Sequence, residues 1–348
     1  MIFNPNKDFF MNEVKVAIIG FGGIARAHYK GYKILKKEQA PVRLLAVCDV
    51  DPSKFDSDVK INIASEENGL SADIACYTSV DDLIASEDFN MADICLPSFL
   101  HKEYTVKLLK AGKHVLCEKP MALSTEQCEE MLVAAKKSGN KLMIGQCLRF
   151  NATYSFLKDI VESGKYGKMR HLFMDRRSAQ PIWGFEHWFE DTERSGGCIL
   201  DMHIHDVDMA RYLLGEPKAV STMAYDTGVR WSVENTRLYY DGTMVVINGS
   251  WDESATCKFY SGYRARFDDA TVICDNGVIT VYPENGEIYK PEIKHVDHMA
   301  EEIRYFASTI LDDTIKNEKN PPSSAAATVK LIEKLRESAE ANGAIITL

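Results

Sequence analysis

A lysine, an aspartate and a histidine in two segments of this sequence have side chains suited to acid–base chemistry. Lys119 lies directly before the proline of GKHVLCEKP, and Asp201 and His205 lie in CILDMHIHDVDMARYLL. Histidine transfers protons near neutral pH, and a lysine ammonium group stabilises negative charge that develops on an oxygen. Hydride removal from a secondary alcohol needs both groups and a hydride acceptor. We therefore predict that Lys119, Asp201 and His205 are catalytic.

The second of these segments has a helical pattern, which predicts how its residues meet. Asp201, His205 and Asp208 are spaced i, i+4 and i+7, so they would share one helical face. Asp201 could then orient His205 or bind a neighbouring substrate hydroxyl. We assign His205 as the base and Lys119 as the acid/base that stabilises the oxygen, although these roles could be exchanged. Asp208 fits a structural role better, such as an ion pair with Arg211.

The hydride acceptor is indicated by a glycine-rich turn near the start of the chain. The apolar run VKVAIIG leads into GFGGIARAH, which matches the dinucleotide fingerprint with alanine in its third place. An acid about 20 residues further on accepts hydrogen bonds from the adenosine ribose, and Asp49 stands there. Its charge favours NAD over NADP, although Lys54 lies nearby. The residues predicted to bind NAD here are Gly20, Phe21, Gly22, Gly23, Ile24 and Asp49.

These side chains require a scaffold, and the first half of the chain predicts a doubly wound sheet. The runs VKVAIIG, VRLLAVCD, DICLPS, HVLCE and KLMIG alternate with helical patterns. Their hydrophobicity is continuous, as in parallel strands covered on both faces. Ligands of such sheets bind beyond the carboxyl ends of the strands, where Asp49, Pro97 and Glu118 stand. We predict a Rossmann domain over residues 13–145, preceded by an extension over residues 1–12.

The second half predicts an α+β domain over residues 146–348. Strand-like runs joined by DG and NG turns indicate hairpins, and helical patterns over 298–311 and 324–341 close the chain. We therefore expect an open, largely antiparallel sheet with helices on one face.

The composition excludes several classes of function. The 348 residues carry a net charge of −10 without basic runs, so neither nucleic acid nor a membrane is expected as a partner. No apolar run approaches the roughly 18 residues of a membrane span, and the start does not read as a secretion signal. The nine scattered cysteines predict a reduced, cytoplasmic protein. His203 and His205 would lie on different helical faces, so we predict no metal.

Three segments together resemble the glucose-fructose oxidoreductase / inositol dehydrogenase / MocA family. They are GFGGIARAH, CLPSFLHKEYTVKLLKAGKHVLCEKPMALS and GGCILDMHIHDVDMARYLLGEP. The resemblance spans nearly the whole chain, and Glu-Lys-Pro is its most specific motif. It implies a nicotinamide cofactor, oxidation of a hydroxyl group on a sugar, inositol or related polyol, and a homodimer or homotetramer formed through the C-terminal sheet.

The same resemblance assigns residues by position. Lys119 matches the catalytic lysine, which also meets the cofactor, and Asp201 and His205 match the Asp and His that contact substrate. The other residues implied to contact the cofactor are Pro97, Ser98, His101 and Glu118. The other residues implied to contact substrate are Arg149, Asn151 and Trp188. Cys198 and His203 depart from the family pattern and could reshape the substrate pocket.

Two other functions use the same fold. The first is cleavage of a glycoside assisted by a retained NAD, and the second is non-catalytic sensing of a dinucleotide or sugar. The joint presence of Lys119, Asp201 and His205 argues against the sensor.

Overall fold

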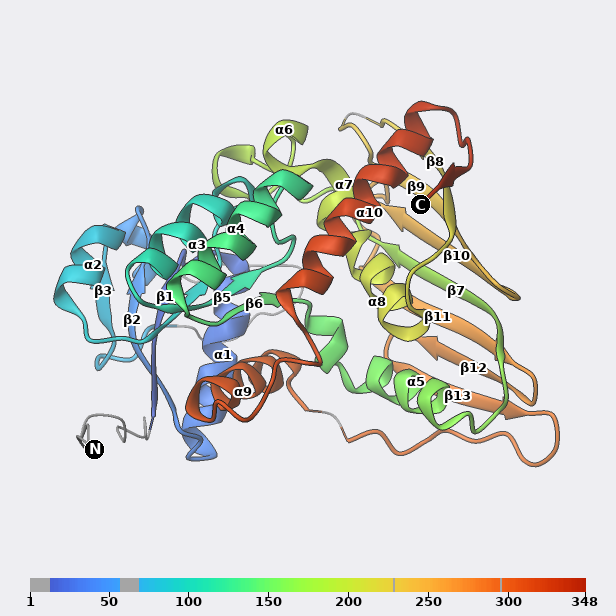
Figure 1. Ribbon diagram of the computed structural model, residues 1–348, viewed down its shortest axis with the longest axis horizontal. Helices are drawn as coiled ribbons and strands as arrows, with labels where there is room; N and C mark the ends of the chain where they lie inside the picture. The colour runs from blue at the N-terminus through green and yellow to red at the C-terminus, as the bar shows by residue number, and fades with distance from the viewer. Residues whose placement is uncertain (1–12, 57–68, 228, 295) are drawn as a thin grey trace, which may run out of the picture.

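Two sheets lie side by side along the long axis of the computed structural model, one of six strands and one of eight (Figure 1). The structure describes residues 13–56, 69–227, 229–294 and 296–348. The extension expected over residues 1–12 lies outside these ranges. Helix α10 (Pro322–Glu340) contacts elements of both halves of the molecule. The arrangement confirms the predicted fold class, a Rossmann domain followed by an α+β domain.

The first sheet is entirely parallel and has the order β3-β2-β1-β4-β5-β6, the doubly wound order of a Rossmann fold. Its strands are β1 (Val14–Ile19), β2 (Val42–Cys48), β3 (Ala75–Tyr77), β4 (Met91–Ile94), β5 (His114–Glu118) and β6 (Leu142–Gly145). Its helices are α1 (Gly23–Lys37), α2 (Val80–Ser86), α3 (His101–Lys110) and α4 (Thr125–Ser138). Because the strands are parallel, the carboxyl ends of β1, β2, β4 and β5 meet at one edge of the sheet.

A late helix completes this first half. Helix α9 (His298–Leu311) packs on α1, and its Ile303 and Phe306 share an apolar core with Tyr32 and Leu35. We expected this helix in the second domain because of its place in the chain. Tertiary packing puts it against the first domain instead, since its apolar face is buried there.

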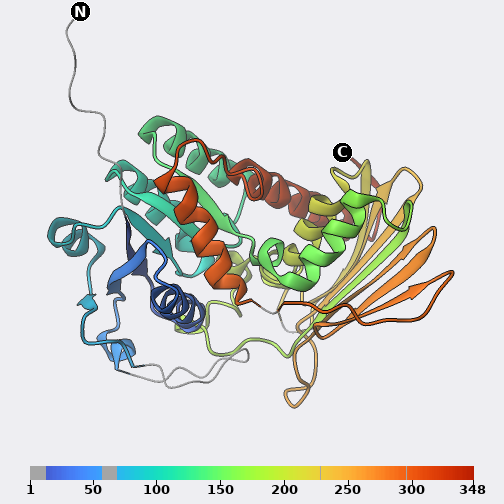
Figure 2. The same ribbon diagram turned by 90° about the horizontal axis from the view of Figure 1, so that it is seen from below.

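The second sheet has the order β13-β12-β11-β7-β10-β9-β8-β14. Its strands are β7 (Met169–Arg177), β8 (Ala219–Tyr225), β9 (Val233–Tyr240), β10 (Thr243–Ser250), β11 (Tyr260–Phe267), β12 (Ala270–Asp275), β13 (Val278–Pro283) and β14 (Ile346–Thr347). Only the pair β7–β10 is parallel among these described strands. Figure 2 shows helices on one face of this sheet, among them α5 (Ala152–Ser163), α8 (Ile204–Leu214) and α10, and none of the described helices on the other. None of the described helices is long and apolar enough to span a membrane.

Candidate active site

Lys119 and Asp201 join the two domains at the carboxyl edge of the first sheet. Lys119 follows β5, and its Nζ lies 3.0 Å from Oδ1 of Asp201 and donates to the Asp201 carbonyl oxygen at 2.6 Å. Asp201 ends the short helix α7 (Gly197–Asp201) of the second domain. The two side chains are 14% and 15% exposed, so the pair is shielded yet still open to a ligand.

The expected single helix through Asp201 and His205 is wrong. The chain forms α7 and then α8, and Met202 and His203 turn between them. Asp201 and His205 therefore do not share a face of one helix. The structure still brings His205 close to Lys119, since the positive charge of Lys119 is one of the causes that lower the pKa of His205.

His205 has the properties of a neutral base. Burial lowers its pKa well below the usual value, and the positive charges of Lys119 and Arg176 lower it further. Its Nδ1 atom is buried and has no hydrogen-bond partner among the described residues. A neutral imidazole can accept a proton from a bound hydroxyl group.

Arg176 is a residue that sequence reasoning missed. It lies on the inner face of β7, where it forms a buried ion pair with Asp206 at 2.7 Å and donates to the Tyr154 hydroxyl at 3.1 Å. The signal was available, because Arg176 continues the alternation of the buried residues Leu172 and Met174. A charged residue on a buried face of a strand needs an oppositely charged partner, and such residues often lie in functional sites.

Cys198 lies in α7 and His203 shortly after it, and both departures from the family pattern contact residues of the second sheet. His203 points toward the second sheet, where its Nε2 lies 2.9 Å from Oγ1 of Thr236 in β9. A Cβ on Gly249 of β10 would lie only 2.7 Å from its Nδ1, so that glycine leaves room for the ring. Burial lowers the pKa of His203 to about 3. Cys198 is fully buried beside Glu234.

The glycine loop has the form that a pyrophosphate group requires. Gly20 has a φ of +86°, and a Cβ there would lie 2.9 Å from the Cys95 carbonyl oxygen, so only glycine fits. A Cβ on Gly22 would meet nothing within 4 Å. Gly22 precedes α1, whose first turn has neither a side-chain cap nor an acidic residue. The N-terminus of α1 can therefore receive an anion, and these residues fit a dinucleotide.

Asp49 anchors this loop from the end of β2. Its Oδ2 accepts the Phe21 N–H at 2.7 Å, and its Oδ1 accepts the Asp51 N–H at 3.0 Å. The Lys54 ammonium group lies 3.1 Å from Oδ1. Asp49 is only 6% exposed, so its carboxylate is a fixed part of the loop.

The segment after β4 was predicted to lie along the cofactor. Pro97 precedes the short turn η2 (Ser98–Leu100), and Ser98 is buried. The ring nitrogens of His101 lie 2.7 Å from the Pro120 carbonyl oxygen and 2.8 Å from the Leu96 carbonyl oxygen. His101 therefore ties the end of β4 to the end of β5. Contact of this segment with a cofactor stays a prediction.

Arg149 and Asn151 take structural positions, which does not support their predicted contact with substrate. The Arg149 guanidinium is 2% exposed and forms two hydrogen bonds with Asp208, at 2.7 and 2.8 Å. Asn151 caps α5 with its side-chain oxygen. Asp208 is structural, as predicted, but its partner is Arg149, and Arg211 pairs with Glu216 instead.

A buried histidine under the site was also missed. His28 of α1 lies between two carboxylates, with Nδ1 2.9 Å from Asp93 and Nε2 2.8 Å from Glu118. Tyr32 donates to Asp93 at 2.7 Å. Burial alone would lower the pKa of His28, but the charge of Asp93 raises it well above the usual value. Cys95 lies close enough to complete a possible ligand group for a metal, but both ring nitrogens of His28 are already hydrogen-bonded to carboxylates.

Glu118 links this histidine to Lys119. Its Oε1 meets His28, and its Oε2 accepts the Lys119 N–H at 3.1 Å. Burial works to raise the pKa of Glu118, but the hydrogen bond and charge of His28 lower it. The backbone of Lys119 is therefore held by a buried carboxylate. The sequence signal was the i, i+4 spacing of His28 and Tyr32, which puts both on one face of α1.

The crossing loop (residues 181–191) reaches from the second domain to the first. The Lys54 ammonium group lies 5.4 Å from the ring centroid of Phe185 in this loop. The Arg194 guanidinium, just beyond the loop, lies 4.4 Å from the ring of Phe99. These contacts fall near the ends of β2 and β4, so the loop spans the edge of the first sheet.

Trp188 lies at the base of the crossing loop. It is 8% exposed and stacks on Phe189 with ring centroids 4.0 Å apart. Phe189 meets Trp251 edge-on at 5.9 Å. Trp188 is thus packed on its own domain, and its contact with substrate stays a prediction.

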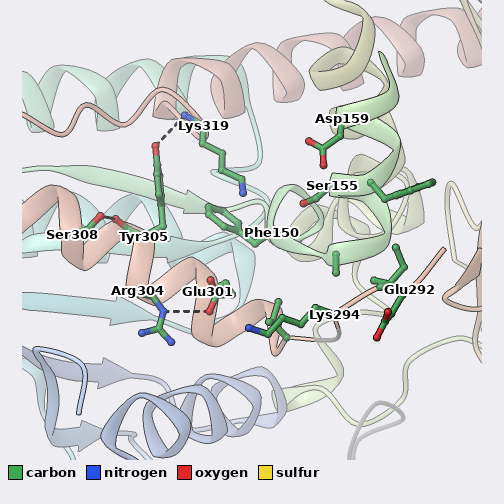
Figure 3. Close-up of a pocket in the computed structure, with 14 residues that line it drawn as sticks. Phe150, Ser155, Asp159, Glu292, Lys294, Glu301, Arg304, Tyr305, Ser308 and Lys319 are labelled. Carbon is green, nitrogen blue, oxygen red and sulfur yellow. Dashed lines mark hydrogen bonds and ion pairs between the residues drawn. The ribbon is translucent and has the colours of Figure 1, made fainter. Parts of the chain in front are cut away.

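A separate cleft of about 610 Å³ lies between α5 and α9 (Figure 3). Asp159 and Ser155 of α5 face Tyr305 and Glu301 of α9 across it. Neither Lys119 nor His205 lines this cleft, so it is not the candidate active site.

The chain belongs to the Gfo/Idh/MocA oxidoreductase family. A family model described as "Oxidoreductase family, NAD-binding Rossmann fold" matches residues 14–146, and the "GFO/IDH/MocA C-terminal domain" model matches residues 154–280. These two matches confirm the resemblance predicted from GFGGIARAH and Glu-Lys-Pro.

Named relatives agree with this family. The chain is 31% identical to a 1,5-anhydro-D-fructose reductase of Ensifer adhaerens, over 59% of this chain and 56% of that protein. It is 29% identical to an inositol 2-dehydrogenase of Rhizobium meliloti, over 61% of this chain and 58% of that protein. These alignments span less than two thirds of each relative.

Solved structures show the same fold over nearly the whole chain. An aldose-aldose oxidoreductase from Caulobacter crescentus, crystallised with glycerol, has a TM-score of 0.81 and 23% identity, covering 97% of this chain and 100% of that one. A levoglucosan dehydrogenase in complex with NADH and L-sorbose also has a TM-score of 0.81, with 16% identity over 97% of this chain and 99% of that one.

Proposed function

We propose that this protein transfers a hydride between NAD and a secondary hydroxyl group of a sugar, inositol or related polyol. The observation that carries this proposal is the Lys119–Asp201 pair at the edge of the NAD-binding sheet, where the charge of Lys119 also acts on a neutral, half-buried His205. The names of the relatives, which are reductases and dehydrogenases of such compounds, support it.

The chain's own groups have separate tasks in this reaction. When bound, NAD supplies the acceptor for the hydride that leaves the C–H bond of the alcohol. His205 accepts the hydroxyl proton on its imidazole ring, and the Lys119 ammonium group stabilises the oxygen as its O–H bond breaks. Asp201 holds Lys119 in place through the 3.0 Å contact. The exchanged assignment, with Lys119 as the proton acceptor, uses the same three residues.

The open second sheet supports association with another copy of the chain. Its uncovered face exposes large apolar side chains from four strands. They are Phe173, Met223, Tyr225, Met244 and Tyr282. We expect a homodimer or homotetramer by light scattering, and Phe173→Glu with Met244→Glu to give monomers.

The nine cysteines are all unpaired, which supports a reducing cytoplasm as the place of action.

A substrate panel tests the reaction. We expect one or more of a set of inositols, aldoses and sugar acids to produce NADH, measured by absorbance, and Lys119→Ala to abolish turnover while NAD still raises the melting temperature. Lys107→Ala is the matched control, because it removes an exposed Lys–Asp pair of 2.8 Å from the same domain. Wild-type turnover by the Lys119 variant would show that this assignment is wrong. Hydrolysis of a glycoside without release of NADH would instead indicate the NAD-assisted cleavage.

A further inference from the structure

Lys54 occupies the adenosine end of the cofactor edge and contacts both domains. Its Nζ lies 3.1 Å from Oδ1 and 3.2 Å from Oδ2 of Asp49. The same ammonium group lies 5.4 Å from the ring of Phe185, which the crossing loop brings from the second domain. The Lys54 side chain is 22% exposed, so it is still partly open to solvent.

The backbone around Lys54 is held as firmly as its side chain. The turn η1 (Pro52–Phe55) begins with Asp51, whose carboxylate accepts the Ser53 N–H at 3.0 Å. The Lys54 carbonyl oxygen accepts a hydrogen bond from the Arg26 guanidinium. Arg26 in turn lies 4.0 Å from the ring centroid of Phe21 in the glycine loop. Lys54 is therefore fixed relative to the loop that fits the pyrophosphate, unlike an ordinary surface lysine.

Asp49 is already well supplied with hydrogen-bond donors. It accepts the N–H groups of Phe21 and Asp51 and both contacts of Lys54. In a dinucleotide site such an acid faces the ribose 2′-hydroxyl of NAD, and a nearby cation accommodates the 2′-phosphate of NADP. Here the acid and the cation are present together, so the repulsion of a phosphate by Asp49 is opposed at the same place.

We propose that Lys54 is the specificity-determining residue that admits NADP, so that this protein binds both dinucleotides and prefers NAD. This inference rests on the proposed function. Asp49 keeps NAD preferred, and Lys54 turns from Asp49 to the 2′-phosphate when NADP binds. The ammonium group is close enough to the acid to exchange partners without movement of the backbone. Phe185 limits the positions that the ammonium group can reach, which makes the crossing loop a positioning element for the adenosine end.

Binding measurements on purified full-length variants test this role without relying on turnover. Dissociation constants for NAD and for NADP are measured by quenching of tryptophan fluorescence, with thermal shift as a second readout. We expect Lys54→Ala to weaken NADP binding by about ten- to a hundredfold, the usual effect of losing a charge-assisted hydrogen bond. NAD binding should change by less than about threefold, because a partly exposed ion pair contributes little. Lys54→Arg should retain NADP binding.

A matched variant controls for the loss of any lysine. Lys36→Ala removes a Lys–Asp pair of 2.9 Å in the last turn of α1, at the opposite end of that helix from the glycine loop. It should leave both dissociation constants unchanged. Phe185→Ala should weaken NADP binding more than NAD binding, but less than Lys54→Ala does.

The outcomes separate this inference from the function beneath it. Equal losses of NAD and NADP binding in Lys54→Ala would overturn it, because Lys54 would then only shape the site. A wild type that binds NAD but not NADP would overturn it while leaving the proposed function intact. A wild type that binds neither dinucleotide would overturn the proposed function, and this inference with it.

Discussion

Two histidines whose pKa values respond to burial, His28 and His205, lie in opposite electrostatic surroundings. His28 lies between the carboxylates of Asp93 and Glu118, and the charge of Asp93 raises its pKa despite burial. The pKa of His205 is lowered by burial and then by the positive charges of Lys119 and Arg176. The first histidine is therefore a fixed cation that holds strands together, and the second is a neutral group that can accept a proton. Burial is common to both, so the neighbouring charges decide the role.

The difference arises from which elements meet at each ring. Helix α1 presents His28 to the strands β4 and β5, which each bring one acid. Helix α8 presents His205 to a lysine that follows β5 and an arginine of β7. The pKa of each imidazole thus depends on charged residues that follow or belong to strands distant from it in the sequence.

The largest effect that we expect, a fall in kcat, comes from replacing His205, and it tests this comparison directly. We expect His205→Asn to lower kcat by about 10²–10⁴-fold, because proton transfer by a positioned side chain contributes that much. The free energy of unfolding should change little, since the Nδ1 atom of His205 has no hydrogen-bond partner among the described residues. Steady-state kinetics and urea unfolding measure the two quantities. A variant with full activity would assign the base to Lys119 instead.

The loss of His28 should have the opposite signature. We expect His28→Gln to lower the free energy of unfolding by about 3–5 kcal/mol, because it leaves two buried carboxylates without their cation. Urea unfolding of the purified variant measures this loss. Tyr32→Phe is the matched control, since it removes one hydrogen bond to Asp93 and should cost about 1–2 kcal/mol. An unchanged stability in His28→Gln would contradict the role of His28 as a structural cation.

The pH dependence of stability should distinguish the same two residues by sign. The folded pKa of His28 is raised, so its stabilisation is complete below about pH 6.5 and is lost as the pH rises toward that folded value. The folded pKa of His205 is lowered, so below about pH 6.5 the unfolded chain takes up a proton that the folded chain does not, and stability falls. Each histidine contributes a slope of at most about 1.4 kcal/mol per pH unit.

Unfolding measured from pH 5 to 9 on both variants isolates these slopes. The slope above pH 6.5 should be flatter in His28→Gln, and the slope below pH 6.5 should be flatter in His205→Asn. The reverse pattern, or identical profiles, would contradict the comparison. Subtracting the wild-type profile removes the contributions of His101 and His114, whose pKa values burial also lowers.

Much of the fold was predictable because the signals are local. Continuous apolar runs predicted the buried parallel strands, and the DG and NG turns predicted the hairpins β9–β10 and β12–β13. The glycine loop, the acid at the end of β2 and the lysine after β5 were also found, since each follows a strand directly. The place of α9 was not predicted, because the amphipathic pattern of a helix does not specify which domain its apolar face will pack against.

The candidate site was predicted less completely, and its errors share one cause. Arg149 and Asp208 were assigned separately from their own segments, but they form one buried ion pair. Asp201 and His205 were placed on one helix, but the chain breaks between them. A spacing in the sequence specifies a face only while the helix continues, and it never specifies the partner of a buried charge.

By itself, the sequence determined the order of the elements, the glycine loop and the residue types available for chemistry. Local sterics and hydrophobic periodicity are properties of neighbouring residues, so they can be read along the chain. Only the tertiary structure decided that Lys119 meets Asp201, that His28 lies between two acids and that Lys54 lies between Asp49 and Phe185. Those arrangements set the charge states, because a buried ionisable group responds to the charges that the fold brings within a few ångströms of it.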